Sequence, residues 1–556
     1  MRNVSVVLIS AFIWLFVNNA SGEIKFQGNV VVSDRELLRN IDQNADSADI
    51  SNQIMRLYQN IGYFDIGIER EYTDRSQNRF FVINEGKLSR ISAIDLNIVP
   101  DSLEPLLSDL RNMLVGRPAS QKTFREFAEG SVNILADNGM PFARGEWVGF
   151  GTDESNNIVA SFKIIPGPFA MISDIEFNGI KRTKPGILEK AAGVKRGDSF
   201  SKKEISRSEK MIEKLQYVEI SSPYYLEASI EGDSCTVVYN IRELPSTRME
   251  GFGGLINIGG KTDFIGRINF EFGDILGTGR MFRLFWNKKD ARSNELSVKY
   301  VEPFIFNSRL NLELEAYQLD RDTLYVTTGG RTSIVHSFGI DLTGVLHTSI
   351  ERTVPESGSN ISRSLKRSIG MEFDYDKTDF EPNPKSGYEI GTDIEYRYRS
   401  NSVVLSGQNP PSNLSSAGLN GAYYYRFTGR AVAAVSFRGW GIVSANGVVP
   451  IDEYRFIGGI HDLRGYAEQQ FPAYRYAIFS TEPRLITGKY SRAYLFADFG
   501  LVMGSQDRNE EYRFKPGYGL GLVSRSGVGR VKVEIGWGDV DFPSGPVLNF
   551  GIGGSF

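Results

Sequence analysis

The most constraining feature of this chain is a long C-terminal region in which apolar and polar residues alternate. From residue 246 to residue 556, segments of roughly ten residues follow one another, separated by Gly, Asn, Asp, Ser and Pro. In the segment SRLNLELEAYQL (308–319), the even positions from 310 to 316 are apolar and the odd positions from 311 to 315 are polar or charged. Successive side chains of a β-strand point to opposite sides, so each segment predicts a strand with one apolar and one polar face.

Strands of this kind suit a transmembrane antiparallel β-barrel. The apolar faces would contact lipid, the polar faces would line the interior, and closure would leave no backbone edge in hydrocarbon. Fifteen or sixteen segments can be counted, and because bacterial barrels have even strand numbers we expect sixteen. The alternative is a soluble β-sandwich or propeller, which the strand count and the export signal described below disfavour.

The first 22 residues have the pattern of a secretory signal peptide. Arg2 precedes an apolar stretch (4–17), and small residues, Ala20 and Gly22, stand before a mature start at Glu23. An N-terminal membrane anchor is the alternative, but the stretch is shorter than the ~20 residues that a helical span needs. Removal of Arg2 would change the net charge from −4 to −4 − 1 = −5. Cys235 is the only cysteine, so no internal disulfide can form.

Residues 23–245 contain three similar units. Each opens with a short alternating strand, continues with segments of helical periodicity and closes with strand-like residues, which predicts a β-α-α-β-β order. The opening strands are EIKFQGN (23–29), SAIDLNIV (92–99) and SDIEFNG (173–179). The closing strands are RFFVINEG (79–86), VASFKIIPG (159–167) and CTVVYNIREL (235–244). We therefore expect small domains at 23–87, 88–168 and 169–245, followed by the barrel at 246–556.

Composition and motifs argue against several classes of function. Basic and acidic residues are nearly balanced, at 63 and 67, so a nucleic-acid partner is not expected. His336, His347 and His461 lack metal-ligand spacing, and no G-x-S-x-G motif occurs. The stretch GGLINIGGKT (253–262) has its lysine one position late for a phosphate-binding loop, and no helix follows it. We expect no enzyme activity, no metal and no cofactor.

The N-terminal units resemble polypeptide-transport-associated (POTRA) domains. The resemblance rests on the strand-Gly-Asn opening, the sequence Tyr-x-x-x-Gly-Tyr-Phe at 58–64 and the Glu-Gly ending at 85–86. The third unit keeps Phe-Asn-Gly at 177–179, whereas Leu-Gln-Tyr at 215–217 replaces the Gly-Tyr pair, and the second unit is the most diverged. The resemblance implies α+β POTRA repeats before the barrel.

The barrel region resembles the BamA/TamA superfamily of outer-membrane assembly and secretion proteins. The resemblance rests on recurring stretches in the family's order: GDILGTGR (273–280), YVEP (300–303), FDYDKTDFEPNPKSGYEI (373–390), LRGY (463–466) after a Gly pair, FSTEPRL (479–485) and FADFG (496–500). It implies a bacterial outer-membrane location with the POTRA domains in the periplasm. It also implies that the loop carrying LRGY folds back into the barrel.

This loop is the first candidate site. Its residues are Gly458, Gly459, Leu463, Arg464, Gly465 and Tyr466. A guanidinium inside a barrel needs carboxylate partners, because an unpaired buried charge is expensive, and the planar fork of arginine can meet two carboxylates at once. We expect Arg464 to pair with Glu482 and Asp498, which period-two counting places on the lumen side. The alternative is an exposed arginine on a local turn.

The second candidate site is the junction of the first and last strands. Both segments, 249–260 and 546–556, are rich in glycine, which weakens strand pairing. The residues singled out are Gly253, Gly254, Phe550 and the terminal Phe556. In the family this junction is a lateral gate for substrate strands, and a terminal aromatic residue resembles the signal that directs barrels to their assembly machinery. Alternatively, the glycines only shape a tight barrel.

The resemblance implies a protein that inserts, folds or translocates other outer-membrane or secreted proteins. Expected partners are unfolded client proteins, the lipid bilayer and an inner-membrane-anchored or periplasmic protein bound through the POTRA domains. Three POTRA domains are more typical of TamA-type members than of BamA-type members, which usually carry five. The alternatives are a two-partner-secretion transporter of one exoprotein and, from another class, a passive pore or receptor. POTRA edges could bind clients by β-augmentation or act as a rigid spacer.

Overall fold

The structure is a computed structural model of the 556-residue chain. It describes residues 23–258, 261–288, 293–359, 361–379, 383–401, 412–460, 462–504, 511–526, 529–539 and 546–555, and for 252–265, 401, 526, 554 and 555 the backbone alone. The expected signal peptide, His461 and Phe556 lie outside these ranges. Within them, no helix is both long and apolar enough to cross a membrane.

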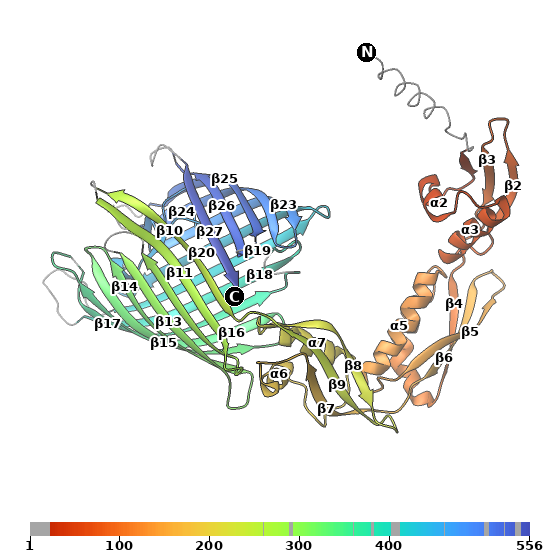
Figure 1. The fold of residues 1–556 in the computed structure, drawn as a ribbon, viewed down its shortest axis with the longest axis horizontal. Coiled ribbons are helices and arrows are strands. Elements are labelled where there is room, and N and C mark those ends of the chain that lie inside the picture. The colour runs from red at the N-terminus through yellow and green to blue at the C-terminus, as the bar shows by residue number, and fades with distance from the viewer. Residues whose placement is uncertain are drawn as a thin grey trace, which may run out of the picture. The chain divides into compact units, whose positions relative to one another are not determined.

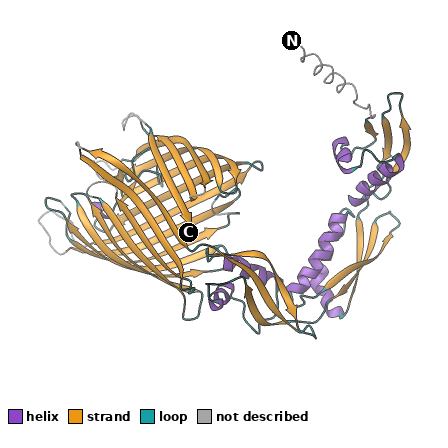
Figure 2. Ribbon diagram, in the orientation of Figure 1, coloured by secondary structure: helices purple, strands orange, loops and turns teal. Residues whose placement is uncertain are grey.

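Three small α+β units precede the barrel (Figures 1 and 2). The first contains β1 (Ile24–Gln27), α2 (Asp34–Asn40), α3 (Ser47–Asn60), β2 (Gly67–Thr73) and β3 (Arg79–Asn84). The second contains β4 (Ile91–Ile98), η1 (Asp101–Leu107), α4 (Ser108–Leu114), α5 (Gln121–Asp137), β5 (Arg144–Thr152) and β6 (Ile158–Ile165). The third contains β7 (Met171–Asn178), α6 (Pro185–Ala192), α7 (Lys202–Glu213), β8 (Val218–Ala228) and β9 (Ser234–Glu243).

Each unit has a three-stranded sheet with its last strand in the centre. The orders are β1-β3-β2, β4-β6-β5 and β7-β9-β8. The first strand of the first two units runs parallel to the central strand, and the second strand runs antiparallel to it. The predicted β-α-α-β-β arrangement is confirmed, and the second unit adds a short 3-10 helix. The expected borders fall in the connections β3–β4, β6–β7 and β9–β10.

Three helices, α2, α3 and α5, begin where the sequence supplies a capping side chain. Ser33, Asp46 and Ser120 each accept a hydrogen bond from the backbone N–H three residues further on, which satisfies one free donor at the helix start. In α3 the buried positions are Ile50, Ile54 and Tyr58, spaced four residues apart on the face that packs on the sheet.

The strand-Gly opening of the first and third units has a steric cause. Gly28 and Gly179 have φ angles of +83° and +90°. A Cβ on them would lie 2.1 Å from the carbonyl oxygen of Ile83 and 2.2 Å from that of Ile241, respectively. Only glycine fits where the chain leaves the first strand and crosses this closely over the central strand.

A glutamate near the end of the central strand holds the same crossing. Glu85 accepts hydrogen bonds from the N–H groups of Val30 and Val31 and from the Tyr58 hydroxyl. Glu243 accepts them from the N–H groups of residues 181–183. Burial acts to raise the pKa of Glu243, but these backbone donors outweigh it and lower that pKa below its ordinary value. The ionised carboxylate thus replaces hydrogen bonds that the crossing loop cannot make within itself.

Sixteen antiparallel strands form the closed barrel. The first eight are β10 (Thr247–Ile258), β11 (Lys261–Ile275), β12 (Arg280–Lys288), β13 (Asn294–Ile305), β14 (Leu310–Arg321), β15 (Tyr325–Ser337), β16 (Leu342–Pro355) and β17 (Ser364–Asp376). The others are β18 (Gly387–Asn401), β19 (Ser412–Arg426), β20 (Ala431–Ser444), β23 (Arg475–Gly488), β24 (Ser491–Met503), β25 (Arg513–Ser526), β26 (Gly529–Trp537) and β27 (Val547–Ser555). The predicted sixteen-stranded barrel is confirmed.

The alternation read from the sequence separates the two surfaces of the barrel wall. On β17, Leu365, Ile369 and Met371 are exposed on the outside, whereas Lys366 and Ser368 are buried on the inside. An apolar outer face matches lipid, and the polar inner face can be satisfied by the loop that the barrel encloses.

Replacing Gly179 with alanine should loosen the third unit. A non-glycine residue at this φ costs about 1–3 kcal/mol before the clash with Ile241 is counted. Cys235, the sole cysteine, is buried in β9 and reports opening of this sheet. We expect its maleimide labelling in the full-length protein to accelerate at least fivefold, because about 1 kcal/mol corresponds to that factor. Gly186→Ala in α6, where a Cβ meets nothing within 4 Å, is the control; equal labelling of the two variants would contradict the steric explanation.

Candidate functional site inside the barrel

The long connection between β20 and β23, residues 445–474, folds into the barrel interior. We call it the lumen loop; it contains η2 (Ile451–Glu453) and the short paired strands β21 (Arg455–Ile457) and β22 (Phe471–Ala473). Leu463 and Tyr466 are almost completely buried and belong to one apolar cluster with wall residues such as Ile478 and Val502. Gly458 and Gly459, with φ of +123° and +96°, start the turn whose Gly459 N–H donates to the Leu463 carbonyl.

Arg464 lies against the two carboxylates expected from the sequence. Its Nε and Nη2 donate to the two oxygens of Asp498 at 2.8 and 2.6 Å, and its Nη1 donates to Glu482 Oε1 at 2.5 Å. The Arg464 backbone N–H also donates to Asp498 Oδ2 at 3.0 Å. Arg464 is 7% exposed and Asp498 0%. The guanidinium is therefore held in a fork by two wall strands, β24 and β23.

Three further wall residues complete this cluster, which the sequence analysis missed. Glu534 on β26 lies 3.6 Å from Arg464 Nη1 and accepts a hydrogen bond from the Tyr494 hydroxyl at 2.6 Å. Arg484 binds the second oxygen of Glu482, with its Nη2 2.6 Å from Oε2. The ring of Phe496 faces the Arg464 guanidinium, 4.0 Å from ring centroid to Cζ, which adds a cation–π contact. Period-two counting along β26 and β23 could have placed Glu534 and Arg484 on the lumen side.

One glycine of the lumen loop and one of the wall let the tip of the loop lie against the barrel wall. A Cβ on Gly465 would lie 2.4 Å from the Trp537 carbonyl oxygen, and one on Gly517 would lie 2.0 Å from the carbonyl oxygen of Arg464. The Tyr466 hydroxyl donates to the Pro516 carbonyl at 2.7 Å and accepts from the Asp539 N–H at 2.9 Å. The loop backbone thus lies directly on β25 and β26. The alternating glycines of GYGLG (517–521) were the available signal for this contact.

A second ionic cluster with reversed charges holds the other end of the lumen loop. Here the loop supplies the acids, Asp452 and Glu453 of η2, and the wall supplies the bases. Arg399 Nη1 lies 2.7 Å from Asp452 Oδ2 and 3.2 Å from Glu453 Oε1. Lys366 Nζ lies 2.9 and 3.0 Å from the same two carboxylates, and Arg397 pairs with Glu453 as well. All side chains of this cluster except Arg397 are at least 98% buried.

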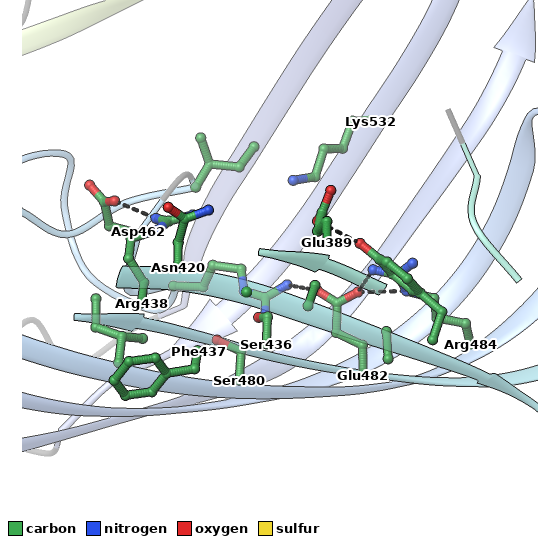
Figure 3. Close-up of a pocket in the computed structure, with 17 residues that line it drawn as sticks. Glu389, Asn420, Ser436, Phe437, Arg438, Asp462, Ser480, Glu482, Arg484 and Lys532 are labelled. Atoms are coloured by element: carbon green, nitrogen blue, oxygen red, sulfur yellow. Dashed lines mark hydrogen bonds and ion pairs between the residues drawn. The ribbon is translucent and has the colours of Figure 1, made fainter. Parts of the chain in front are cut away.

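A polar cavity of about 240 Å³ adjoins the Arg464 cluster (Figure 3). Its lining includes Glu389, Asn420, Arg438, Glu482 and Arg484. Figure 3 shows Arg484 and Glu482 joined within the cavity wall, and Arg438 joined to Asp462 of the lumen loop. Positive and negative groups therefore alternate around the space. Among the residues that the structure describes, no group of three or more His, Cys, Asp and Glu side chains could hold a metal ion.

The junction of the first and last strands is short. Within the described part of the chain, four pairs join β10 to β27, from Arg248 with Ser555 to Gly251 with Ile552. By contrast, β10 pairs with β11 along its whole length, from Thr247 to Ile258. Gly253 and Gly254 lie in β10 beyond Gly251, the last described residue that pairs with β27, and Phe550 pairs with Val533 of β26. Phe556 lies outside the described residues. The predicted seam residues thus lie next to the short stretch of pairing between β10 and β27, which covers only the first part of β10.

Fold and site together define the class of protein: a transmembrane β-barrel with N-terminal POTRA-like units and a lumen loop fastened to its wall. Two family models match the chain. The Omp85 superfamily domain matches residues 274–556, and the POTRA model, surface antigen variable number repeat, matches residues 170–244. The chain belongs to the Omp85 superfamily. It is accordingly a bacterial outer-membrane protein of the assembly and secretion type, with its POTRA domains in the periplasm.

Solved structures resemble the fold at low sequence identity. BamA from Haemophilus ducreyi lacking POTRA domains 1–3 aligns with a TM-score of 0.54 and 16% identity, covering 84% of this chain and 100% of that one. CdiB from Acinetobacter baumannii aligns with a TM-score of 0.52 and 14% identity over 85% of this chain and 91% of that one. CdiB from Escherichia coli gives a TM-score of 0.51 and 14% identity over 91% and 97%. A sequence search of curated proteins finds no match.

Arg464 and Glu482 should be energetically coupled. Removing one partner of a buried ion pair costs about 3–5 kcal/mol, because the other charge is left unpaired. Arg464→Ala, Glu482→Gln and the double variant should therefore be non-additive by about 0.5–3 kcal/mol in urea unfolding in detergent micelles. The more exposed pair Arg438–Asp462 is the control, and Arg438→Ala should cost no more than about 1 kcal/mol. Strict additivity would show that Arg464 and Glu482 do not act as a pair.

Removing Arg399 should release the η2 end of the lumen loop. Arg399→Met leaves two buried carboxylates with fewer cations, a loss of the same order as a broken buried ion pair. We expect protease cleavage within residues 445–474 to accelerate more than about tenfold, because cleavage follows the population of the open form. Arg367→Met, on the outward face of β17, is the matched control. Unchanged cleavage in Arg399→Met would mean that the Arg464 cluster alone holds the loop.

Proposed function

We propose that this protein inserts, folds or translocates other outer-membrane or secreted proteins through the seam between β10 and β27. The observation that carries the proposal is the four-pair closure of the barrel. Among the described residues, β10 beyond Gly251 has no paired residue in β27, although β10 continues to Ile258. Unpaired strand edges are templates for pairing with another chain. A client strand could therefore add to β10 or β27 at this point.

The lumen loop is compatible with opening of the seam, because its ion pairs are made with other strands of the barrel. Its carboxylate partners stand on β23, β24 and β26, and its basic partners stand on β17 and β18. None of these ion pairs involves β10 or β27. Opening at the seam would then require breaking a few backbone pairs, while the buried ionic clusters that organise the interior stay intact.

The POTRA domains would receive the client before it reaches the barrel. Each three-stranded sheet has two edge strands, and β2, β5 and β8 each form one of them. On β5, Val148 and Phe150 are 54% and 58% exposed. An exposed edge with apolar side chains can bind an extended segment through main-chain hydrogen bonds, which do not depend on client sequence. The same edges could bind a periplasmic or inner-membrane-anchored partner. A rigid spacer role would need no such exposure.

The presence of three α+β units favours a TamA-type member within the superfamily, with the borders at 87, 168 and 245. A two-partner-secretion transporter of one exoprotein is the alternative. It would pass its substrate through the lumen and would require the lumen loop to move. The Arg464 and Arg399 clusters oppose that movement, because both would have to break. A passive pore would need neither the short seam nor the exposed POTRA edges.

Locking the seam should abolish activity. In a Cys235→Ser background, Gly251→Cys with Ile552→Cys places two thiols on a directly paired position. We expect the oxidised protein in proteoliposomes to stop promoting the folding of a client barrel, measured by its heat-dependent electrophoretic mobility, and reduction to restore it. Phe270→Cys with Leu284→Cys, on the long β11–β12 pair, is the control. Full activity of the oxidised seam variant would exclude passage through the seam.

A further inference from the structure

The first two POTRA units meet the next unit through the same position, the glycine that follows the second main helix. The Gly62 carbonyl accepts a hydrogen bond from the Ser89 N–H at 2.9 Å, and the Gly139 carbonyl accepts one from the Ala170 N–H at 2.8 Å. Ser89 and Ala170 hold equivalent places, each five residues after the end of the central strand, β3 or β6. The helix exit of one unit is thus a docking point for the domain that follows.

The third unit has Gln216 at this position, and the domain that follows it is the barrel. Arg248 of β10 again stands five residues after the end of the central strand, β9. Its Nη2 donates to the Gln216 carbonyl at 3.0 Å, and its Nη1 donates to Gln216 Oε1 at 2.6 Å. Gln216 has a φ of +61°, which is uncommon for residues other than glycine. Glycine would suit this backbone better, and what the glutamine adds is a second hydrogen bond to Arg248.

Arg248 is also the residue at which the described pairing of the seam begins. Its backbone pairs with Ser555 of β27. Its Nη1 lies 3.7 Å from Oε1 of Glu271, the residue opposite it on β11. Glu271 has a second cation, because Nη2 of Arg283 lies 2.6 Å from its Oε2. Gln216 therefore binds a residue that belongs to the seam itself.

The third unit also holds the other strand of the β10–β11 hairpin. Asp274, in the turn after β11, is 2% exposed. It accepts hydrogen bonds from the Thr183 hydroxyl at 2.8 Å and from Arg182 Nε at 3.1 Å. The Lys184 N–H donates to the Gly277 carbonyl at 2.9 Å. The hairpin cannot move away from the third unit without breaking contacts on both of its strands.

We propose that Gln216 is a positioning residue of the seam: with Arg248 it holds β10 against the third POTRA unit and limits how readily the seam opens. The inference rests on the proposed function, in which clients pass between β10 and β27. It adds that this opening moves the β10–β11 hairpin relative to the third unit. Both hydrogen bonds to the guanidinium then have to break, whereas departure of β27 alone would leave them intact.

The test is amide hydrogen exchange at the seam of the full-length protein in detergent micelles, without client. Exchange in residues 248–251 and 552–555 reports the population in which β10 and β27 have separated. Gln216→Gly and Arg248→Met should each accelerate it by at least about fivefold, because hydrogen bonds to a charged group are lost. The double variant should accelerate it no further than the faster single variant. Gln77→Gly is the matched control, a glutamine at φ +64° in the β2–β3 turn, and should leave the seam unchanged.

Labelling of Cys235 separates a positioning role from a structural one. Gln216→Gly relieves the left-handed backbone, so maleimide labelling of this buried thiol should be no faster than in the unmodified protein while the seam exchanges faster. Gln216→Glu keeps both the length and the acceptor and should restore slow exchange at the seam. Gln216→Asn, which is one methylene shorter, should not. Heat-dependent electrophoretic mobility verifies that each variant is folded.

Three results would overturn the proposal. One is unchanged seam exchange in either single variant. The others are labelling of Cys235 that accelerates in parallel with seam exchange, and equal seam exchange in Gln216→Glu and Gln216→Gly, since either would show that Gln216 only supports the fold of its unit. These outcomes do not depend on client passage, because no client is present. Failure of the proposed function appears instead as full activity of the oxidised Gly251→Cys, Ile552→Cys protein.

Discussion

The structure depends on the pairing of charged side chains that are buried inside the closed barrel wall. A transmembrane barrel needs polar inner faces, because alternation forces every second side chain inward, yet those faces are costly unless each charge finds a partner. The lumen loop supplies the partners with both signs: Arg464 meets Glu482 and Asp498 on one side, and Asp452 and Glu453 meet Lys366 and Arg399 on the other. Removing the loop would take the arginine away from Asp498 and the two carboxylates away from Lys366 and Arg399.

The two clusters make the placement of the loop specific. Because the loop is basic at one anchor and acidic at the other, a reversed insertion would bring like charges together at both ends. Close packing reinforces this choice, since Gly465 and Gly517 admit the loop backbone where any side chain would collide. A wall organised in this way from β17 to β26 can tolerate a weak closure at β10 and β27. The seam can therefore be the least stable part of the barrel without disordering its interior.

How much the sequence predicts depends on how far apart in the chain the interacting residues lie. Local rules succeeded: period-two alternation predicted fifteen or sixteen strands, of which the even number was chosen, and helical periodicity predicted the β-α-α-β-β order. The proximity of Arg464, Glu482 and Asp498 was expected from motif order and strand phase. The cluster around Arg399 was not, because its members lie more than 50 residues apart in the chain. With 67 acidic residues available, no local rule selects Asp452 and Glu453. Glu534 was missed for the same reason, although its strand phase placed it inward.

The sequence by itself determined the class of fold and the sidedness of each strand, since both follow from the backbone geometry of neighbouring residues. It also marked Gly28 and Gly179 as parts of a recurring strand-Gly opening, whereas the steric need for glycine there became visible only in the structure. Only the tertiary structure decided which charges pair and how far the seam closes. These depend on register and closure, which bring distant segments together through the summed pairing of all sixteen strands.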